Sequence, residues 1–435
     1  MRRFAIEKLV SWKDSDGRKP LIIYGARQVG KTWLVREFAK SHFKNIIDID
    51  FNKNPEFSKL FVQDLDPFRI IKALEVYFSR KIDPNDTLIF FDEIQECPSA
   101  LNSLKYFEDS AKEYHVISAG SYLGLGSTGR FPVGKVESIT LFPMSFYEYL
   151  DAIGQELLLE AIEKLDFELL AVLSSQLIEH LKTYLFVGGM PEAVSVYSRT
   201  KDLVKTRKVQ NELLINYDYD FGKHIPTNIV PKVEMIWNSI PNMLAKEKKK
   251  FVYKEIKLGG RASQFEDALM FLEDTRLVYK VLKITKARLP LSRYPEKDIF
   301  KLYMLDVGLL SAKSNVEIAS FYLNGNQIFS DFQGAITEQY VLQELVQSQE
   351  YPIFYWRREK GAAEVDFILQ FKSNIIPIEV KSTRNTQSKS LNAYRDIEKP
   401  HYAIRLSMKN FGNSDGLISI PLYLMGSFSS VINAI

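Results

Sequence analysis

The sequence is poor in the residues that build disulfides and metal centres. Its 435 residues include one cysteine, Cys97, and five histidines. A single cysteine excludes a disulfide within the chain and a zinc site made from several cysteines. No apolar stretch approaches the roughly 20 residues that a membrane-spanning helix requires. We therefore expect a cytoplasmic protein that has no membrane segment and no export signal.

Neither sign of charge is in large excess over the whole chain, because the formal net charge is only +3. The distribution is nevertheless uneven. Residues 226–312 contain 16 Lys and Arg against 10 Asp and Glu, a net charge of +6, whereas residues 313–435 contain 12 of each. Two interpretations of the basic segment remain open: a surface for nucleic acid or another acidic partner, or a solvated charged face.

A phosphate-binding loop is indicated near the start of the chain. The apolar run at 20–24 fits a buried strand, GARQVGKT follows at 25–32, and an apolar helical stripe follows from 32 to 39. In the pattern GxxxxGK[ST], backbone N–H groups and the lysine surround phosphate oxygens, and the last hydroxyl binds Mg²⁺. We expect the nucleotide to be bound by Gly25, Ala26, Arg27, Gln28, Val29, Gly30, Lys31, Thr32 and Trp33.

An acidic pair follows another apolar run, at 87–91. Ligands of open α/β sheets bind at the carboxyl ends of the strands, where Asp92 and Glu93 would lie. We expect Asp92 and Thr32 to hold Mg²⁺, Glu93 to act as the general base, and Lys31 to stabilise the reacting phosphates. Further strands are predicted at 45–51, 114–119 and 136–141, which gives an α/β fold with a parallel sheet.

Three further polar residues are candidates for contacts with the γ-phosphate. Ser118 and Ser121 belong to or follow a strand next to the acidic one, and either would serve as a phosphate sensor, the alternative being turn chemistry. Arg130 is a candidate for stabilising the transition state, the alternative being an ordinary surface arginine.

Residues 20–150 resemble AAA-type P-loop ATPases of bacteria and archaea. The resemblance rests on the loop at 25–32, DEIQECP at 92–98, Gly120-Ser121, Gly129-Arg130 and LFPMSF at 141–146. It implies ATP and Mg²⁺ as ligands, ATP hydrolysis and, in many relatives, a homo-oligomer. GGMPE at 188–192 resembles a motif of the family's helical lid and implies Pro191 near the adenine, whereas the alternative is a proline at a helix start.

The basic middle segment has the element order of a winged helix. A short helix at 253–258, a Gly259-Gly260 turn and a second helix at 263–275 precede two strands at 277–282 and 300–304. A functional interpretation is DNA binding by Lys254, Lys257, Arg261 and lysines of the loop between the strands. The alternative is a module that docks one domain on another.

The last part of the chain predicts a hairpin with clustered charges. Alternation at 364–371 and 375–381 places Asp366, Glu379 and Lys381 on one side of two adjacent strands. Two carboxylates suit a divalent metal ion, and a lysine suits activation of water or a leaving phosphate.

The spacing D-x12-ExK in this hairpin resembles the restriction-endonuclease-like, PD-(D/E)xK, superfamily. The resemblance implies Asp366, Glu379 and the helical Glu338 as metal ligands and Asp366, Glu379 and Lys381 as catalytic residues. The stretch YMLDVGL at 303–309 fits the domain of unknown function that follows these ATPases. The alternative is a nuclease fold that is retained for binding or scaffolding.

The sequence thus predicts four parts: an AAA-type ATPase core at 1–150, a helical lid at 151–225, a winged-helix-like segment at 226–312 and a restriction-endonuclease-like α/β domain at 313–435. The expected function is Mg²⁺-dependent ATP hydrolysis that rearranges the attached module on DNA. DNA would contact residues 226–312 and the C-terminal domain. The alternative is a signalling or scaffold ATPase whose nuclease-like domain is inert and binds a partner.

Overall fold

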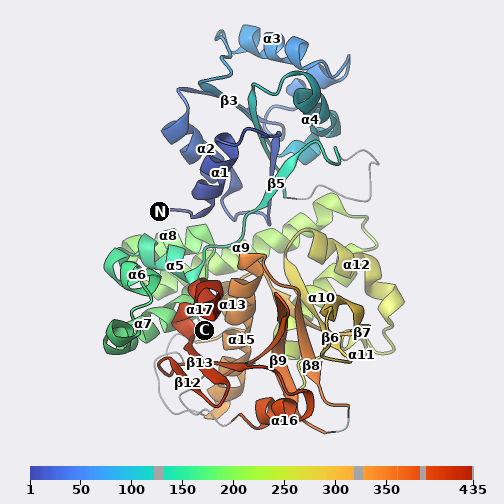
Figure 1. Ribbon diagram of the computed structural model, residues 1–435. Coiled ribbons are helices and arrows are strands. Elements are labelled where there is room, and N and C mark those ends of the chain that lie inside the picture. Colours follow the sequence, from blue (N-terminus) through green and yellow to red (C-terminus); the bar gives the residue numbers. More distant parts are fainter. Residues whose placement is uncertain (122–131, 318–326, 360, 383–387, 434–435) are drawn as a thin grey trace. The chain divides into compact units, whose positions relative to one another are not determined.

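The computed structural model describes residues 1–121, 132–317, 327–359, 361–382 and 388–433. The chain divides into two compact units (Figure 1), an N-terminal unit, Arg2–Phe142, and a C-terminal unit that begins at Pro143. Each unit contains its own sheet. None of the described helices combines the length and the apolar character that crossing a membrane would require.

The N-terminal unit alternates strands and helices. Its helices are α1 (Ala5–Lys13), α2 (Lys31–His42), α3 (Pro67–Tyr77) and α4 (Pro98–Ser110). Two 3₁₀ turns lie at Pro55–Phe61 and Ile94–Glu96. Its strands are β1 (Leu21–Tyr24), β2 (Asn45–Asp50), β3 (Thr87–Asp92), β4 (His115–Ala119) and β5 (Glu137–Thr140). All five strands and the helix after the glycine-rich loop lie where the sequence predicts them.

The five strands form one parallel sheet in the order β2-β3-β4-β1-β5. Every residue of β3 is buried, as expected for a central strand that is covered on both faces. Side chains of α3 and α4 pack with Ile89 and Phe91 in one core cluster. Because the strands are parallel, the loop after β1 and the acidic residues after β3 share one edge of the sheet.

The C-terminal unit begins with helices and ends with most of its strands. Its helices are α5 (Phe146–Ala152), α6 (Glu156–Glu163), α7 (Phe167–Val187), α8 (Pro191–Thr200), α9 (Leu203–His224), α10 (Val230–Leu244), α11 (Tyr253–Ile256), α12 (Ala262–Asp274), α13 (Val307–Lys313), α15 (Gln327–Ser348), α16 (Lys389–Glu398) and α17 (Phe428–Asn433). Its strands are β6 (Val278–Ile284), β7 (Pro295–Met304), β8 (Ile353–Arg357), β9 (Glu364–Phe371), β10 (Asn374–Val380), β11 (Ala403–Ser407), β12 (Gly412–Ser414) and β13 (Leu417–Pro421). Short 3₁₀ turns lie at Leu291–Arg293 and Leu422–Ser427.

The eight strands of this unit form one mixed sheet in the order β12-β13-β11-β10-β9-β8-β6-β7. The predicted hairpin β9–β10 is present and antiparallel, with Phe367 opposite Ile378. The helix–turn–helix–hairpin order of the middle segment is also present, as α11, α12, β6 and β7. The hairpin β6–β7 is not a separate body, however, because β6 pairs in parallel with β8.

The hairpin β6–β7 belongs to the larger sheet because it shares an apolar core with β8 and β9. Ile284 of β6 is fully buried in a cluster with Trp356 of β8 and Val365 of β9. The predicted boundary between residues 312 and 313 therefore divides a single sheet, and the segment's winged-helix interpretation stays a prediction. Figure 1 shows β6, β8 and β9 side by side in this sheet.

Candidate functional site

The glycine-rich loop after β1 has the backbone that the phosphate-binding pattern requires. Gly25 has φ +148°, and a Cβ atom there would lie 2.3 Å from the carbonyl oxygen of Leu141. Gly30, with φ 93°, is the N-cap of α2. Arg3 supports the loop from outside, because its guanidinium donates to the carbonyl of Val29 at 2.8 Å. Arg3 carries no pattern that identifies this role in the sequence.

Lys31 points into its own loop. Its ammonium donates to the carbonyl oxygens of Gly25 at 2.9 Å and Ala26 at 2.8 Å, and the side chain is buried. Burial lowers the pKa of Lys31 to about 8, and the charges of Glu93 and Asp92 oppose that shift. A buried ammonium that donates to two neutral carbonyl oxygens would be stabilised further by anionic phosphate oxygens in the same loop.

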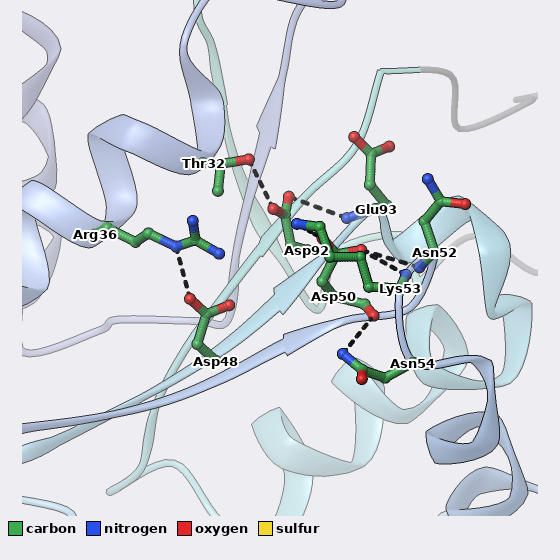
Figure 2. Close-up of polar contacts among 9 residues, drawn as sticks. All are labelled: Thr32, Arg36, Asp48, Asp50, Asn52, Lys53, Asn54, Asp92 and Glu93. Carbon is green, nitrogen blue, oxygen red and sulfur yellow. Dashed lines mark hydrogen bonds and ion pairs between the residues drawn. The ribbon is translucent and has the colours of Figure 1, made fainter.

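Thr32 and Asp92 form a direct pair, as Figure 2 shows. The Thr32 hydroxyl donates to Asp92 Oδ2 at 2.7 Å, and the backbone N–H of Glu93 donates to Asp92 Oδ1 at 3.1 Å. The Glu93 side chain extends away from this pair and accepts a hydrogen bond from the Gln95 amide. A hydroxyl and a carboxylate at this distance are suitable oxygen ligands for Mg²⁺, which prefers few protein ligands beside phosphates and water.

The sequence analysis missed a second acidic side chain at this edge. Asp50 ends β2 directly beside Asp92, and the two are Cα partners in the strand register. Asp50 accepts hydrogen bonds from the backbone and side chain of Lys53, which lower its pKa although burial opposes this (Figure 2). The signal was available, because Asp50 closes a predicted strand just as Asp92 does.

Burial is the main reason that the pKa of Asp92 lies above its usual range. The charges of Glu93 and Asp50 raise it further, and the hydrogen bond from Thr32 opposes them. A buried carboxylate with acidic neighbours gains from a nearby cation. The donor set of Thr32 and Asp92 therefore fits a divalent metal ion.

The remaining predicted residues of this site differ in their surroundings. Ser121 is buried beside the loop, where its hydroxyl lies 3.4 Å from Nε of Arg27, so it lies at the predicted edge. The Ser118 hydroxyl donates to the carbonyl of Leu21 at 3.2 Å within the sheet, which leaves Ser121 as the better sensor candidate. Trp33 is exposed in the first turn of α2. Arg130 lies outside the described residues.

Pro191 is the first residue of α8, the position that its alternative interpretation predicts. The preceding Gly188 and Gly189 lie against backbone. A Cβ on Gly189 would lie 2.0 Å from the carbonyl oxygen of Met144, and the N–H of Gly189 donates to Asp306 Oδ2 at 2.6 Å. This motif is therefore built into the C-terminal unit, and its relation to the nucleotide stays a prediction.

The predicted nuclease-like residues lie near one another in the C-terminal unit. Lys381 Nζ lies 2.8 Å from Glu379 Oε1, and the N–H of Val380 donates to Asp366 Oδ2 at 2.8 Å. Burial raises the pKa of Asp366 well above its usual range, and the nearby charge of Glu338 adds to the effect. Asp366 and Glu338 thus belong to one charged cluster, and the Glu379–Lys381 ion pair is joined to Asp366 through the backbone of Val380.

Two lysines that the sequence analysis did not select neutralise this cluster. Lys301 of β7 is fully buried and lies 3.0 Å from Glu338 Oε1 and 2.8 Å from Glu364 Oε1. Lys249 and the Tyr303 hydroxyl also bind the Glu338 carboxylate. The lysine charges hold the pKa of Glu338 well below its usual range despite burial.

These contacts bear on metal binding by the nuclease-like residues. Both carboxylate oxygens of Glu338 already face ammonium groups, so Glu338 does not fit a divalent cation while both lysines stay bound. Within the described ranges, no group of three or more His, Cys, Asp or Glu side chains is arranged to hold a metal ion. We derive no reaction step from a metal ion in this cluster.

Comparison with known families assigns the N-terminal part. A model described as an AAA domain matches residues 17–150, which include the loop, Thr32, Asp92 and Glu93. Residues 17–150 are therefore similar to an AAA domain. Two further models, each described as a domain of unknown function, match residues 178–319 and 333–425. The restriction-endonuclease-like interpretation of the last domain therefore stays a prediction.

Individual relatives are distant. An uncharacterized protein of Methanocaldococcus jannaschii is 24% identical over 402 residues, which cover 88% of this chain and 78% of that protein. A Walker-type ATPase of Pyrococcus abyssi is similar in structure with a TM-score of 0.45 and 14% identity, over 72% of this chain and 95% of that one. The ORC1 protein of Aeropyrum pernix, solved in complex with DNA, has a TM-score of 0.28 and 12% identity, over 73% and 92% of the two chains.

Proposed function

We propose that the AAA domain binds and hydrolyses Mg-ATP and that the nucleotide state changes how the C-terminal unit engages DNA. The Thr32–Asp92 hydrogen bond at 2.7 Å, beside the buried ammonium of Lys31, is the observation that carries the proposal. Bound Mg-ATP would supply the electrophilic phosphorus and a divalent charge. The residues of the chain bind this nucleotide, orient its phosphates and activate the attacking water.

Each residue has a distinct part in the proposed reaction. Lys31 exchanges its loop carbonyls for phosphate oxygens and neutralises charge that develops on them. Thr32 and Asp92 hold the cation beside those oxygens. Glu93, which directly follows the last residue of β3, accepts a proton from the attacking water. Ser121 donates to the phosphate that is lost, through its hydroxyl.

ATP turnover by the full chain tests this proposal. Lys31→Ala removes the phosphate-binding charge and is expected to lose nucleotide affinity and turnover together. Glu93→Gln keeps the shape and is expected to lose turnover by about 10²–10⁴-fold while it still binds ATP. Lys40→Ala is a matched control, since Lys40 is exposed on the same helix. Unchanged turnover in both active-site variants would contradict the proposal.

The charge pairing in the C-terminal unit favours a binding role over a cutting role. Lys249 and Lys301 supply to Glu338 the positive charge that a metal ion would bring to a nuclease. We therefore favour a C-terminal unit that holds nucleic acid without cleaving it. Wild-type protein is expected to leave single-stranded and duplex DNA and RNA intact with Mg²⁺ or Mn²⁺. Cleavage that Asp366→Ala and Lys381→Ala both abolish would establish the nuclease instead.

A further inference from the structure

A cavity of about 670 Å³ lies in the C-terminal unit, outside the two clusters described above. It is formed by the segment between α10 and α11 with Glu255 of α11, by β6 and β7, and by the end of β8 with residues 358, 359 and 361. Its lining residues are Lys246, Glu247, Lys248, Lys250, Val252, Glu255, Lys283, Ile299, Tyr355, Arg357, Arg358, Glu359 and Gly361. This volume is within the range that holds small organic ligands.

The lining of the cavity carries more positive than negative charge. It contains six Lys and Arg side chains and three Glu side chains. Three of the cations are paired with carboxylates: Lys246 with Glu255, Lys283 with Glu296 at 2.7 Å and Arg357 with Glu364 at 3.3 Å. Over the described residues, the other three cations, Lys248, Lys250 and Arg358, have no ion-pair partner.

The unpaired cations come from two segments that are far apart in sequence. Lys248 and Lys250 precede α11, in a segment where the N–H of Phe251 donates to the carbonyl of Phe300 in β7 at 2.8 Å. Arg358 follows β8, which pairs with β6 and through it with β7. Like charges held in one cavity repel one another unless an anion binds between them. Such a ligand would need several negative groups, because three such cations line the cavity.

Two residues that line the cavity, Tyr355 and Arg357, also contact the charged cluster around Glu338. Tyr355 is buried, and the Lys301 ammonium lies 4.9 Å from the centre of its ring. Arg357 belongs to the lining and also reaches Glu364, a partner of Lys301. The cluster thus holds Tyr355 and Arg357 in place in the cavity lining. This gives the buried lysines a positioning role beside an anion site.

We propose that this cavity binds the phosphate groups of a nucleic-acid strand, with Lys248, Lys250 and Arg358 as the principal contacts. The proposal deepens, and rests on, the proposed engagement of DNA by the C-terminal unit. A strand offers a regular series of single negative charges that lysines contact as point charges and arginine contacts with its planar fork. Such contacts read no base sequence, so the expected binding is largely sequence-independent.

The test measures fluorescence anisotropy of a labelled single-stranded 20-mer and a labelled duplex with the full chain, from 50 to 300 mM salt. The cavity variant combines Lys248→Gln, Lys250→Gln and Arg358→Gln. Its control combines Lys164→Gln, Arg199→Gln and Lys208→Gln, which remove the same charge from exposed positions outside the lining and outside residues 226–435. Thermal unfolding of both variants checks that they are folded.

The cavity variant is expected to lose at least about tenfold in affinity at low salt. The slope of log K against log salt should become shallower by about 2 for a single strand, since each phosphate contact contributes roughly 0.7. The control variant should change affinity by less than about threefold. Equal losses in the two variants, or binding of an acidic peptide in place of either oligonucleotide, would overturn the proposal. The variants and the wild type separate the two ideas. Nucleic-acid binding that the cavity variant retains in full overturns the cavity alone, whereas no binding by the wild type overturns the proposed engagement of DNA as well. Binding without ATP turnover overturns the ATPase.

Discussion

The backbone N–H of Gly189 donates to Asp306 Oδ2 at 2.6 Å, although 117 positions of sequence separate the two residues. Asp306 also caps α13 by accepting from the N–H of Leu309 at 2.9 Å. The pair joins the predicted lid motif to the end of the predicted winged-helix-like segment. Motifs assigned to different domains therefore share one buried polar junction, and a shift of one motif would disturb the other.

The close approach at Gly189 predicts a large cost for any side chain there. In Gly189→Ala the new Cβ would lie 2.0 Å from the Met144 carbonyl oxygen, so backbone must move. We expect the free energy of unfolding to fall by about 1–3 kcal/mol, measured by urea denaturation. Gly222→Ala is the control, because a Cβ at Gly222 meets nothing within 4 Å in α9. Alanine there should stabilise by about 0.5–1 kcal/mol, and similar effects at the two sites would refute the packing argument.

The Thr32–Asp92 pair predicts that the Thr32 hydroxyl mediates the effect of Mg²⁺ on nucleotide affinity. Thr32→Ala should bind ATP analogues about equally with and without Mg²⁺, because one oxygen ligand and the hydrogen bond to Asp92 are lost. Thr32→Ser retains the hydroxyl and should keep the wild-type response. Calorimetric titration with and without Mg²⁺ measures both variants. A full response to Mg²⁺ in Thr32→Ala would show that the metal is held elsewhere.

Glu344 predicts a pH dependence of stability. Burial raises the pKa of Glu344 to about 8, while the N–H of Phe146 donates to its carboxyl at 3.0 Å. Between about pH 4.5 and 8 the folded protein retains a proton that the unfolded chain releases, so this carboxyl lowers stability as the pH rises. Glu344→Gln removes that loss, and its stability relative to wild type should grow over this window.

Unfolding of the Glu344→Gln variant and wild type in urea at pH 5, 6.5 and 8 measures this difference. Glu160→Gln is the control, because Glu160 is exposed on α6. The control should differ from wild type by a small amount that does not grow across the series. A constant difference for Glu344→Gln would mean that Glu344 is already ionised in the folded protein at pH 5.

The buried charge of Lys301 predicts a large loss of stability when its ammonium group is removed. Lys301→Met leaves the carboxylates of Glu338 and Glu364 without their shared cation, and the loss should be about 3–5 kcal/mol of unfolding free energy. Lys297→Met, at an exposed position near the start of the same strand, is the matched control and should change stability by less than about 0.5 kcal/mol. Combining Lys301→Met with Glu338→Gln should restore part of the loss, since the buried negative charge that Lys301 neutralises is removed as well. A double variant no more stable than Lys301→Met would contradict the coupling.

Local sequence pattern was sufficient to predict the positions of these elements in the N-terminal unit. The loop at 25–32, the strand that ends at Asp92 and the helix that follows Gly30 are each defined by adjacent residues, so their positions followed from periodicity and motif chemistry. The hairpin β9–β10 was predictable for the same reason, because its turn and alternation lie within 17 consecutive residues. Asp50 was within reach of the same argument and was missed because no motif includes it.

The amino-acid sequence was sufficient to predict the glycine-rich loop, the acidic residues at the end of β3 and the α/β character of both units. The folded structure was needed to show that β6 pairs with β8, that Lys249 and Lys301 neutralise Glu338, and that Asp306 accepts from the N–H of Gly189. Parallel pairing and buried ion pairs join residues dozens of positions apart. Their partners are selected by packing and desolvation in the folded chain, which leave no periodic trace in the sequence.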